Sequence, residues 1–170
     1  MPYEPFYERF KELALSETRS FTIDEGYPYL PADEYALMEA YCNEEDCDCR
    51  RVFFNVVSRK SMEVMAVVSF GWEDESFYRE WFGGGNDKYT RMATSEMTGL
   101  KLNLASPQSN IAPALLAPIH EILQDPAYVE RLKRHYQIFK EKVDPKHFRK
   151  SGRAKHIDIA KPKSKKRKRN

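Results

Sequence analysis

All three cysteines of this 170-residue chain fall within eight residues, at Cys42, Cys47 and Cys49, with the spacing C-x4-C-x-C. A thiolate is a soft, charged ligand, and Zn2+ binds four such groups tetrahedrally at about 2.0–2.3 Å. The C-x-C pair can chelate one ion from a single turn, and Cys42 can reach the same ion from the end of an apolar, strand-like run. The spacing therefore predicts a metal site, with zinc as the ion, that clamps a strand–turn–strand connection.

The fourth ligand of such a site stays open, because the cysteines supply only three. His135, at the edge of the apolar stripe of the last expected helix, is the first candidate, and His120 on the helix before it is the second. Asp46 or Asp48 could complete the site locally, and so could water. An iron–sulfur cluster is less favoured because it normally uses a fourth cysteine. The two remaining histidines lie in a basic tail and are poor candidates: His147 and His156.

A simpler interpretation is that the three thiols are unlinked. Cys42 would then be an ordinary buried residue, and Cys47 and Cys49 would be exposed and unreactive, because nearby carboxylates raise the pKa of a thiol. A redox or nucleophilic role is the least favoured, since the chain has no C-x-x-C pair and no obvious base. Under the metal hypothesis, by contrast, the charge of the ion would offset the negative charge of the acids in the turn, with Arg50 and Arg51 placed to help. These acids are Glu44, Glu45, Asp46 and Asp48.

The runs around the cysteines predict an α+β fold. Residues 34–42, 51–59 and 63–72 are rich in Val, Phe, Tyr and Met, and short connections between them favour antiparallel pairing. We expect a three- to four-stranded antiparallel meander packed against N-terminal and C-terminal helices.

Apolar spacing of three and four residues predicts the helices. Residues 4–17 form one, residues 76–82 a short second, and 111–124 a third. The pair Asp125-Pro126 caps a fourth over 127–143, whose stripe includes Tyr128, Leu132 and Tyr136. The stretch 88–103 fits either a helical turn or a strand.

The net charge of +2 hides an asymmetry. Residues 146–170 carry 12 Lys and Arg and one acidic residue, a net charge of +11. The other 145 residues carry 16 Lys and Arg and 25 Asp and Glu, a net charge of −9. We therefore expect a single α+β domain over residues 1–144 and a low-complexity basic tail over 145–170, disordered when unbound.

The basic tail is also the part of the chain suited to binding nucleic acid. Counterion release would give this arm salt-sensitive affinity for RNA or DNA, the ribosome included, through its densest cations: Lys163, Lys165, Lys166, Arg167, Lys168 and Arg169. A merely solvated tail and an acidic protein partner are the alternatives.

Several function classes find little support. No apolar run reaches the ~20 residues of a membrane span, and the N-terminus lacks the pattern of a secretory signal. Three cysteines without such a signal favour a reducing, cytoplasmic setting. No nucleophile–base–orienter motif, H-E-x-x-H or EF-hand loop is present, so an enzyme is less favoured than a binding protein.

Three segments, 34–42, 47–52 and 128–136, resemble an uncharacterised family of bacterial proteins with a Y-C-x4-C-D-C-R-R signature. The resemblance spans roughly residues 28–143 and implies a metal site and a bacterial cytosol, without an established activity. The sequence thus favours a non-enzymatic, zinc-stabilised binding module with a nucleic-acid-binding arm. The alternatives are a metal-dependent enzyme with an open three-cysteine site and a protein-interaction adaptor.

Overall fold

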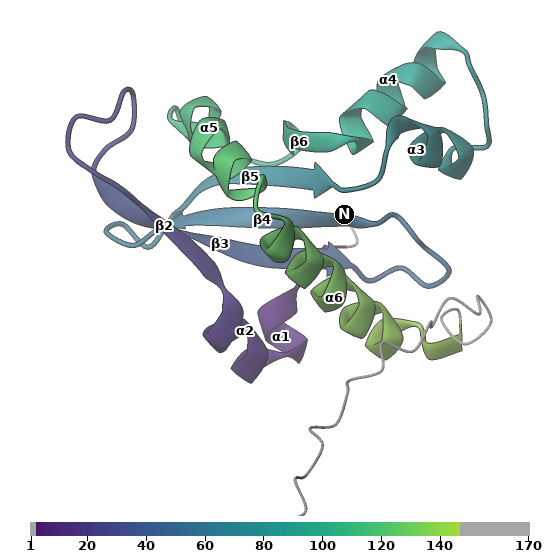
Figure 1. Ribbon diagram of the computed structural model, residues 1–170, viewed down its shortest axis with the longest axis horizontal. Coiled ribbons are helices and arrows are strands. Elements are labelled where there is room, and N and C mark those ends of the chain that lie inside the picture. Colours follow the sequence, from purple (N-terminus) through teal and green to yellow (C-terminus); the bar gives the residue numbers. More distant parts are fainter. Residues whose placement is uncertain (1–2, 147–170) are drawn as a thin grey trace, which may run out of the picture.

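A computed structural model of the chain describes residues 3–146. It has an α+β architecture in which six strands form one antiparallel sheet and six helices pack around it (Figure 1). The elements, in chain order, are β1 (Tyr3–Pro5), α1 (Phe6–Arg9), α2 (Lys11–Glu17), β2 (Arg19–Ile23), β3 (Asp33–Cys42), β4 (Arg51–Ser58), β5 (Val64–Gly71), α3 (Glu75–Trp81), α4 (Lys88–Met97), β6 (Gly99–Leu102), α5 (Ala112–Ile122) and α6 (Pro126–Val143). The basic tail from residue 147 onward, predicted to be disordered, lies outside the described part.

The sheet has more strands than the three to four that the sequence predicts. The three expected runs are present as β3, β4 and β5, each antiparallel to the next. The additional strands are short: β6 pairs with β5, while β1 and β2 both pair with β3. In the described part of the chain the strand order is β1-β3-β4-β5-β6, with β2 beside the other half of β3. The α+β class is confirmed, and the strand count is corrected upward.

The N-terminal segment departs most from expectation. Residues 4–17 were expected to form one helix, because Phe6, Phe10 and Leu13 recur at helical spacing. Residues 3–5 are instead extended and pair with the end of β3, with Tyr3 opposite Cys42. The helix is then interrupted at Phe10, where φ is −131° and ψ is 54°. Pairing with a distant strand has overridden the local helical pattern.

The main hydrophobic cluster lies on one face of the sheet, beneath α5 and α6, which cross the near face in Figure 1. Alternate residues of the long strands point into it, such as Tyr41 from β3 and Phe54 from β4. From α6 it receives the predicted stripe, including Leu132 and Phe139. The N-cap of α6 is as predicted, since Asp125 accepts the backbone N–H of Ala127.

A second, smaller cluster contains the buried residues Cys42, Cys49, Tyr78 and Met97. Tyr41 and Cys42 are consecutive in β3, so their side chains point to opposite faces of the sheet. Tyr41 packs in the main cluster and Cys42 in the smaller one. The helices α3 and α4 supply Tyr78 and Met97, and both approach β5 closely at Gly71. A Cβ atom at Gly71 would lie 2.0 Å from the Met97 carbonyl oxygen, so only glycine fits there.

Candidate metal centre

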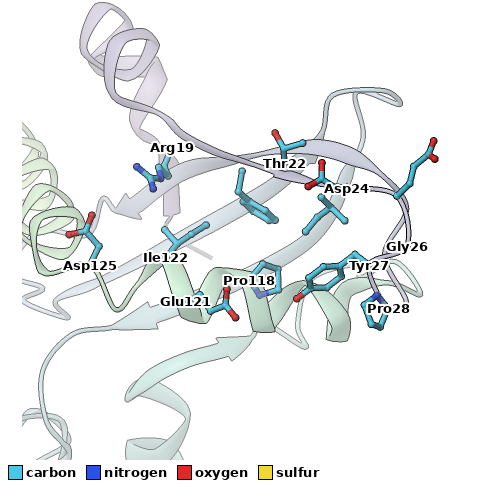
Figure 2. A pocket seen from close by; sticks show the side chains of 13 residues that line it. Arg19, Thr22, Asp24, Gly26, Tyr27, Pro28, Pro118, Glu121, Ile122 and Asp125 are labelled. Carbon is cyan, nitrogen blue, oxygen red and sulfur yellow. The ribbon is translucent and has the colours of Figure 1, made fainter.

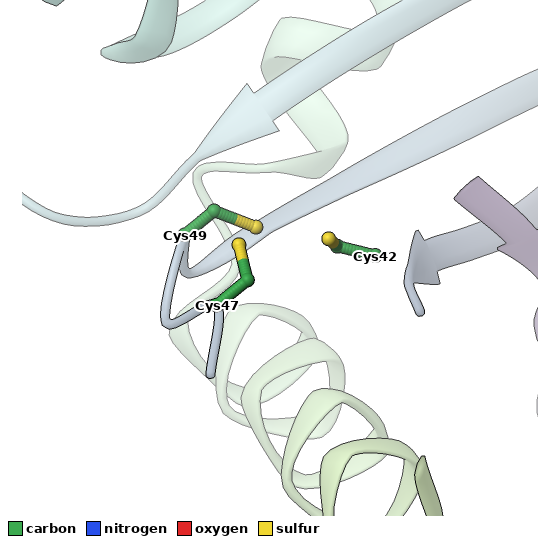
Figure 3. A group of neighbouring side chains, drawn as sticks. All are labelled: Cys42, Cys47 and Cys49. Atoms are coloured by element: carbon green, nitrogen blue, oxygen red, sulfur yellow. The ribbon is translucent and has the colours of Figure 1, made fainter. Parts of the chain in front are cut away.

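The structure brings the three cysteines together (Figure 3). Cys42 is the last residue of β3, and Cys47 and Cys49 lie in the connection to β4. All three Sγ atoms lie within 4.8 Å of one another, which is close enough for one ion to contact them all. Cys42 and Cys49 are buried, Cys47 is half-buried, and none forms a disulfide. This group could therefore hold a metal ion, as the C-x4-C-x-C spacing predicts.

The connection is held in an unusual backbone conformation on both sides of the C-x-C pair. Asp46 and Arg50 have φ of 57° and 44°, in the left-handed region that few residues other than glycine occupy. Such a conformation persists only where surrounding contacts enforce it. Here α6 and its C-cap residue supply them: the carboxylate of Asp144, the C-cap, accepts the Asp46 backbone N–H at 2.6 Å, and the Tyr136 hydroxyl accepts that of Arg50 at 3.4 Å.

The Arg50 side chain ties the turn to the chain that follows β5. Its guanidinium forms ion pairs with Asp48 at 3.0 Å and with Glu73 at 2.9 Å, and lies 4.3 Å from the centre of the Phe77 ring. Arg50 thus offsets the acidity of the turn, as expected from the sequence. Arg51 does not do so: its guanidinium instead donates to the Ser69 hydroxyl at 2.8 Å on the neighbouring strand.

The thiols influence one another's ionisation. Hydrogen bonds from Cys47 and Cys49 lower the pKa of Cys42, whereas the hydrogen bond with Cys42 raises the pKa of both Cys47 and Cys49. The group therefore releases one proton readily and holds the other two. A cation that binds all three thiolates must displace the retained protons, so its affinity should rise with pH.

His135, the first candidate for the fourth ligand, is not part of the thiol group. Its ring stacks on Phe6 at 4.5 Å, Nδ1 lies 2.7 Å from the Glu39 carboxylate, and Nε2 lies 3.0 Å from that of Glu17. Glu39 also accepts the Tyr41 hydroxyl hydrogen at 2.7 Å. His135 therefore belongs to a buried polar network that joins α6, β3 and α2, on the other face of the sheet from Cys42.

The remaining candidates also lie outside the thiol group. His120 is exposed on α5, with its Nε2 3.4 Å from the Gln124 amide nitrogen. The Asp48 carboxylate is engaged by Arg50 and by the Tyr136 hydroxyl. In the described part of the chain, the Asp46 carboxylate is not one of the ligand atoms that converge with the three sulfurs. The three thiols are thus the ligand atoms that the structure assembles among residues 3–146.

Two residues near the thiols were missed by the sequence analysis. The Glu44 carboxylate lies 3.9 Å from the Cys42 Sγ, where a small rotation could bring it to a bound ion. Lys140 is fully buried, and its ammonium donates to the carbonyl oxygens of Glu44 at 2.7 Å and Cys42 at 3.4 Å. Its position four residues after Tyr136, on the buried side of α6, was the available signal.

A cavity of about 760 Å3 lies away from the thiols, between the β2–β3 connection and α5 (Figure 2). Its lining includes Asp24, Glu121 and Asp125, with Arg19 at one end. None of the residues predicted to form a site lines it, and its acids belong to the exposed surface. This cavity adds no ligand to the candidate metal centre.

Among residues 3–146 no helix is both long and apolar enough to cross a membrane. The six cations predicted to contact nucleic acid, Lys163 to Arg169, lie outside the described residues. Comparison of the chain with protein-family models, curated proteins and solved structures gives no match. The fold and site therefore define an α+β protein with a largely buried three-thiol group that could hold a metal.

Proposed function

We propose that this protein is a non-enzymatic, zinc-stabilised binding module of the reducing cytoplasm, whose basic C-terminal arm contacts RNA or DNA, the ribosome included. The observation that carries the zinc proposal is the convergence of Cys42, Cys47 and Cys49 within 4.8 Å. Three thiolates suit Zn2+, which prefers sulfur ligands in closed structural sites. The fourth position would be filled by Glu44 or by water.

A structural role is favoured by the hydrogen bonds that other parts of the fold make to the backbone of the cysteine connection. Tyr136, Asp144 and Lys140 all reach from α6 and its C-cap to backbone atoms of the cysteine connection. An ion bound there would join the end of β3 to the connection before β4, which side chains of the α6 region already hold. The alternative of an enzyme with an open three-cysteine site requires a fourth position that exchanges with added ligands.

Metal analysis tests the zinc proposal. Protein purified without chelator should contain one Zn2+ per chain, and titration with Co2+ should give a thiolate charge-transfer band with the intensity of three sulfur ligands. Cys47→Ser should lower the metal affinity by at least about tenfold and reduce that band by a third. Wild-type protein that binds neither ion would overturn the proposal, and a cobalt spectrum shifted by added azide would favour the enzyme alternative.

The nucleic-acid proposal rests on charge. With a net of +11 over residues 146–170 and −9 elsewhere, the arm is the part of the chain suited to phosphate contact. Truncation after Asp144 should abolish retention of RNA and DNA on a filter at low salt. In the full chain, retention should fall steeply between about 50 and 200 mM salt, as counterion release requires.

A matched control keeps the arm's length and removes five of its 12 Lys and Arg side chains, which lowers the net charge of residues 146–170 from +11 to +6. Replacing Lys165, Lys166, Arg167, Lys168 and Arg169 by glutamine should weaken retention and its dependence on salt, though less than truncation does, if phosphate contact is the cause. Cys47→Ser should retain the arm's binding, because the arm carries its own charge. Unchanged retention after truncation would refute the proposal.

A further inference from the structure

Lys140 is a buried cation beside the thiol group. Its side chain is fully buried, and its Nζ donates to two carbonyl oxygens of the cysteine connection. Among residues 3–146 its ammonium forms no ion pair with a carboxylate, whereas Lys133 on the exposed side of the same helix pairs with Glu130. A buried ammonium is costly unless negative charge lies nearby. The structure therefore places a positive charge beside the thiols, in a region that also holds the carboxylates of Glu44 and Asp144.

The net charge of the bound site depends on the ion. Binding of Zn2+ displaces the protons that the three thiols still hold and leaves a Zn(S-Cys)3 complex with a charge of −1. Arsenous acid, As(OH)3, also takes three thiols, but it forms three As–S bonds with loss of three water molecules, and the product is neutral. Lys140 would neutralise the zinc complex, and it would gain nothing from the arsenic adduct.

We propose that Lys140 is the counter-ion of the metal–thiolate complex, and that it makes the three-cysteine site selective for a divalent cation over trivalent arsenic. This inference rests on the proposed metal-binding function and adds the residue that determines its specificity. A Glu44 carboxylate in the fourth position would make the zinc complex more negative and would strengthen the same preference. Lys140 acts on the ion through charge and through the backbone of Cys42 and Glu44, without coordinating it.

The test compares two ions in four proteins: wild type, Lys140→Met, Lys140→Gln and the matched control Lys142→Met, whose lysine is exposed on the same helix. The Met variant keeps the aliphatic stem without the charge. The Gln variant keeps a donor for the carbonyl oxygens, and it decides the outcome if the Met variant does not fold. Zinc affinity is measured by competition with a chromophoric chelator, and arsenite affinity by competition with a dithiol.

Both Lys140 variants should bind Zn2+ about 10- to 100-fold more weakly than wild type, the usual range for a residue that supports metal ligands indirectly. Their affinity for arsenite should equal that of wild type or rise, because the neutral adduct has no net Coulomb attraction to the ammonium, whereas a free thiolate has. Lys142→Met should leave both affinities unchanged.

The ratio of the zinc affinity to the arsenite affinity distinguishes an electrostatic role of Lys140 from a purely structural one. If Lys140 only holds the turn in shape, both ions should be lost together and the ratio should equal that of wild type, which would overturn the inference. An unchanged zinc affinity in both variants would overturn it as well. A wild-type protein that binds neither ion would instead refute the proposed function itself, so the two failures are distinguishable.

Discussion

Replacement of Cys49 by serine is expected to lower the melting temperature of the zinc-loaded protein by about 10 °C. An ion that binds only the folded state, at a thousand times its dissociation constant, adds about 4 kcal/mol to the free energy of unfolding. In a protein of this size each kcal/mol corresponds to roughly 2–4 °C. Thermal denaturation with and without excess zinc measures the effect.

The chain offers no fourth cysteine as a matched control, because all three lie in the thiol group. Chelator-treated wild type takes that place, and it should melt within about 2 °C of the variant. The loss should also be local. The main cluster receives no cysteine, so hydrogen exchange should accelerate around residues 42–51 and change little near Leu37 and Val56. Equal melting of the variant and wild type in zinc would contradict a structural site.

The second large effect concerns His135. Its replacement by alanine should lower the free energy of unfolding by about 2–5 kcal/mol, the usual range when a buried side chain is truncated to alanine, because the change also leaves a buried hydrogen-bonding group without its partner. The side chains of His135 and Glu39 expose only 1% and 4% of their surface. The other oxygen of Glu39, Oε1, has no hydrogen-bond partner among residues 3–146, so loss of the imidazole leaves the carboxylate with the Tyr41 hydroxyl alone.

Urea unfolding measures this loss, and His120→Ala is the matched control. His120 is exposed, so its replacement should change the free energy of unfolding by no more than about 0.5 kcal/mol. The pair Glu39→Leu and His135→Leu should cost less together than the sum of the single changes, because the double variant buries no unpaired group. His135→Ala should keep its zinc, since the imidazole lies outside the thiol group. Loss of zinc with unchanged stability would reverse both assignments.

The cysteine group and the α+β class could be predicted because their signals are local. Three thiols within eight residues can meet across a single turn, and Asp125 followed by proline marks the start of α6 in the sequence itself. The ambiguous stretch 88–103 resolved into both of its alternatives, with α4 followed by β6.

What could not be predicted depends on contacts between distant residues. His135 meets Glu39 and Glu17 from 96 and 118 positions away, and no periodicity reports such a pairing. The edge strands β1 and β2 have few residues and take their extended form from pairing with β3. Lys140 looked like one of many surface lysines, because its burial depends on where the cysteine connection lies.

The alternation of β3 has a consequence for how the chain folds. Tyr41 and Cys42 face opposite sides of the sheet, with Ala40 paired to Phe53 of β4. A slip of one residue between these strands would turn every side chain of β3 over. Cys42 would then enter the main cluster, and the partner of His135 would point away from it. Cys47 and Cys49 lie in the loop between the two strands, so only the correct register brings all three sulfurs together. A bound metal would therefore stabilise the native register of β3 and β4 relative to a shifted one.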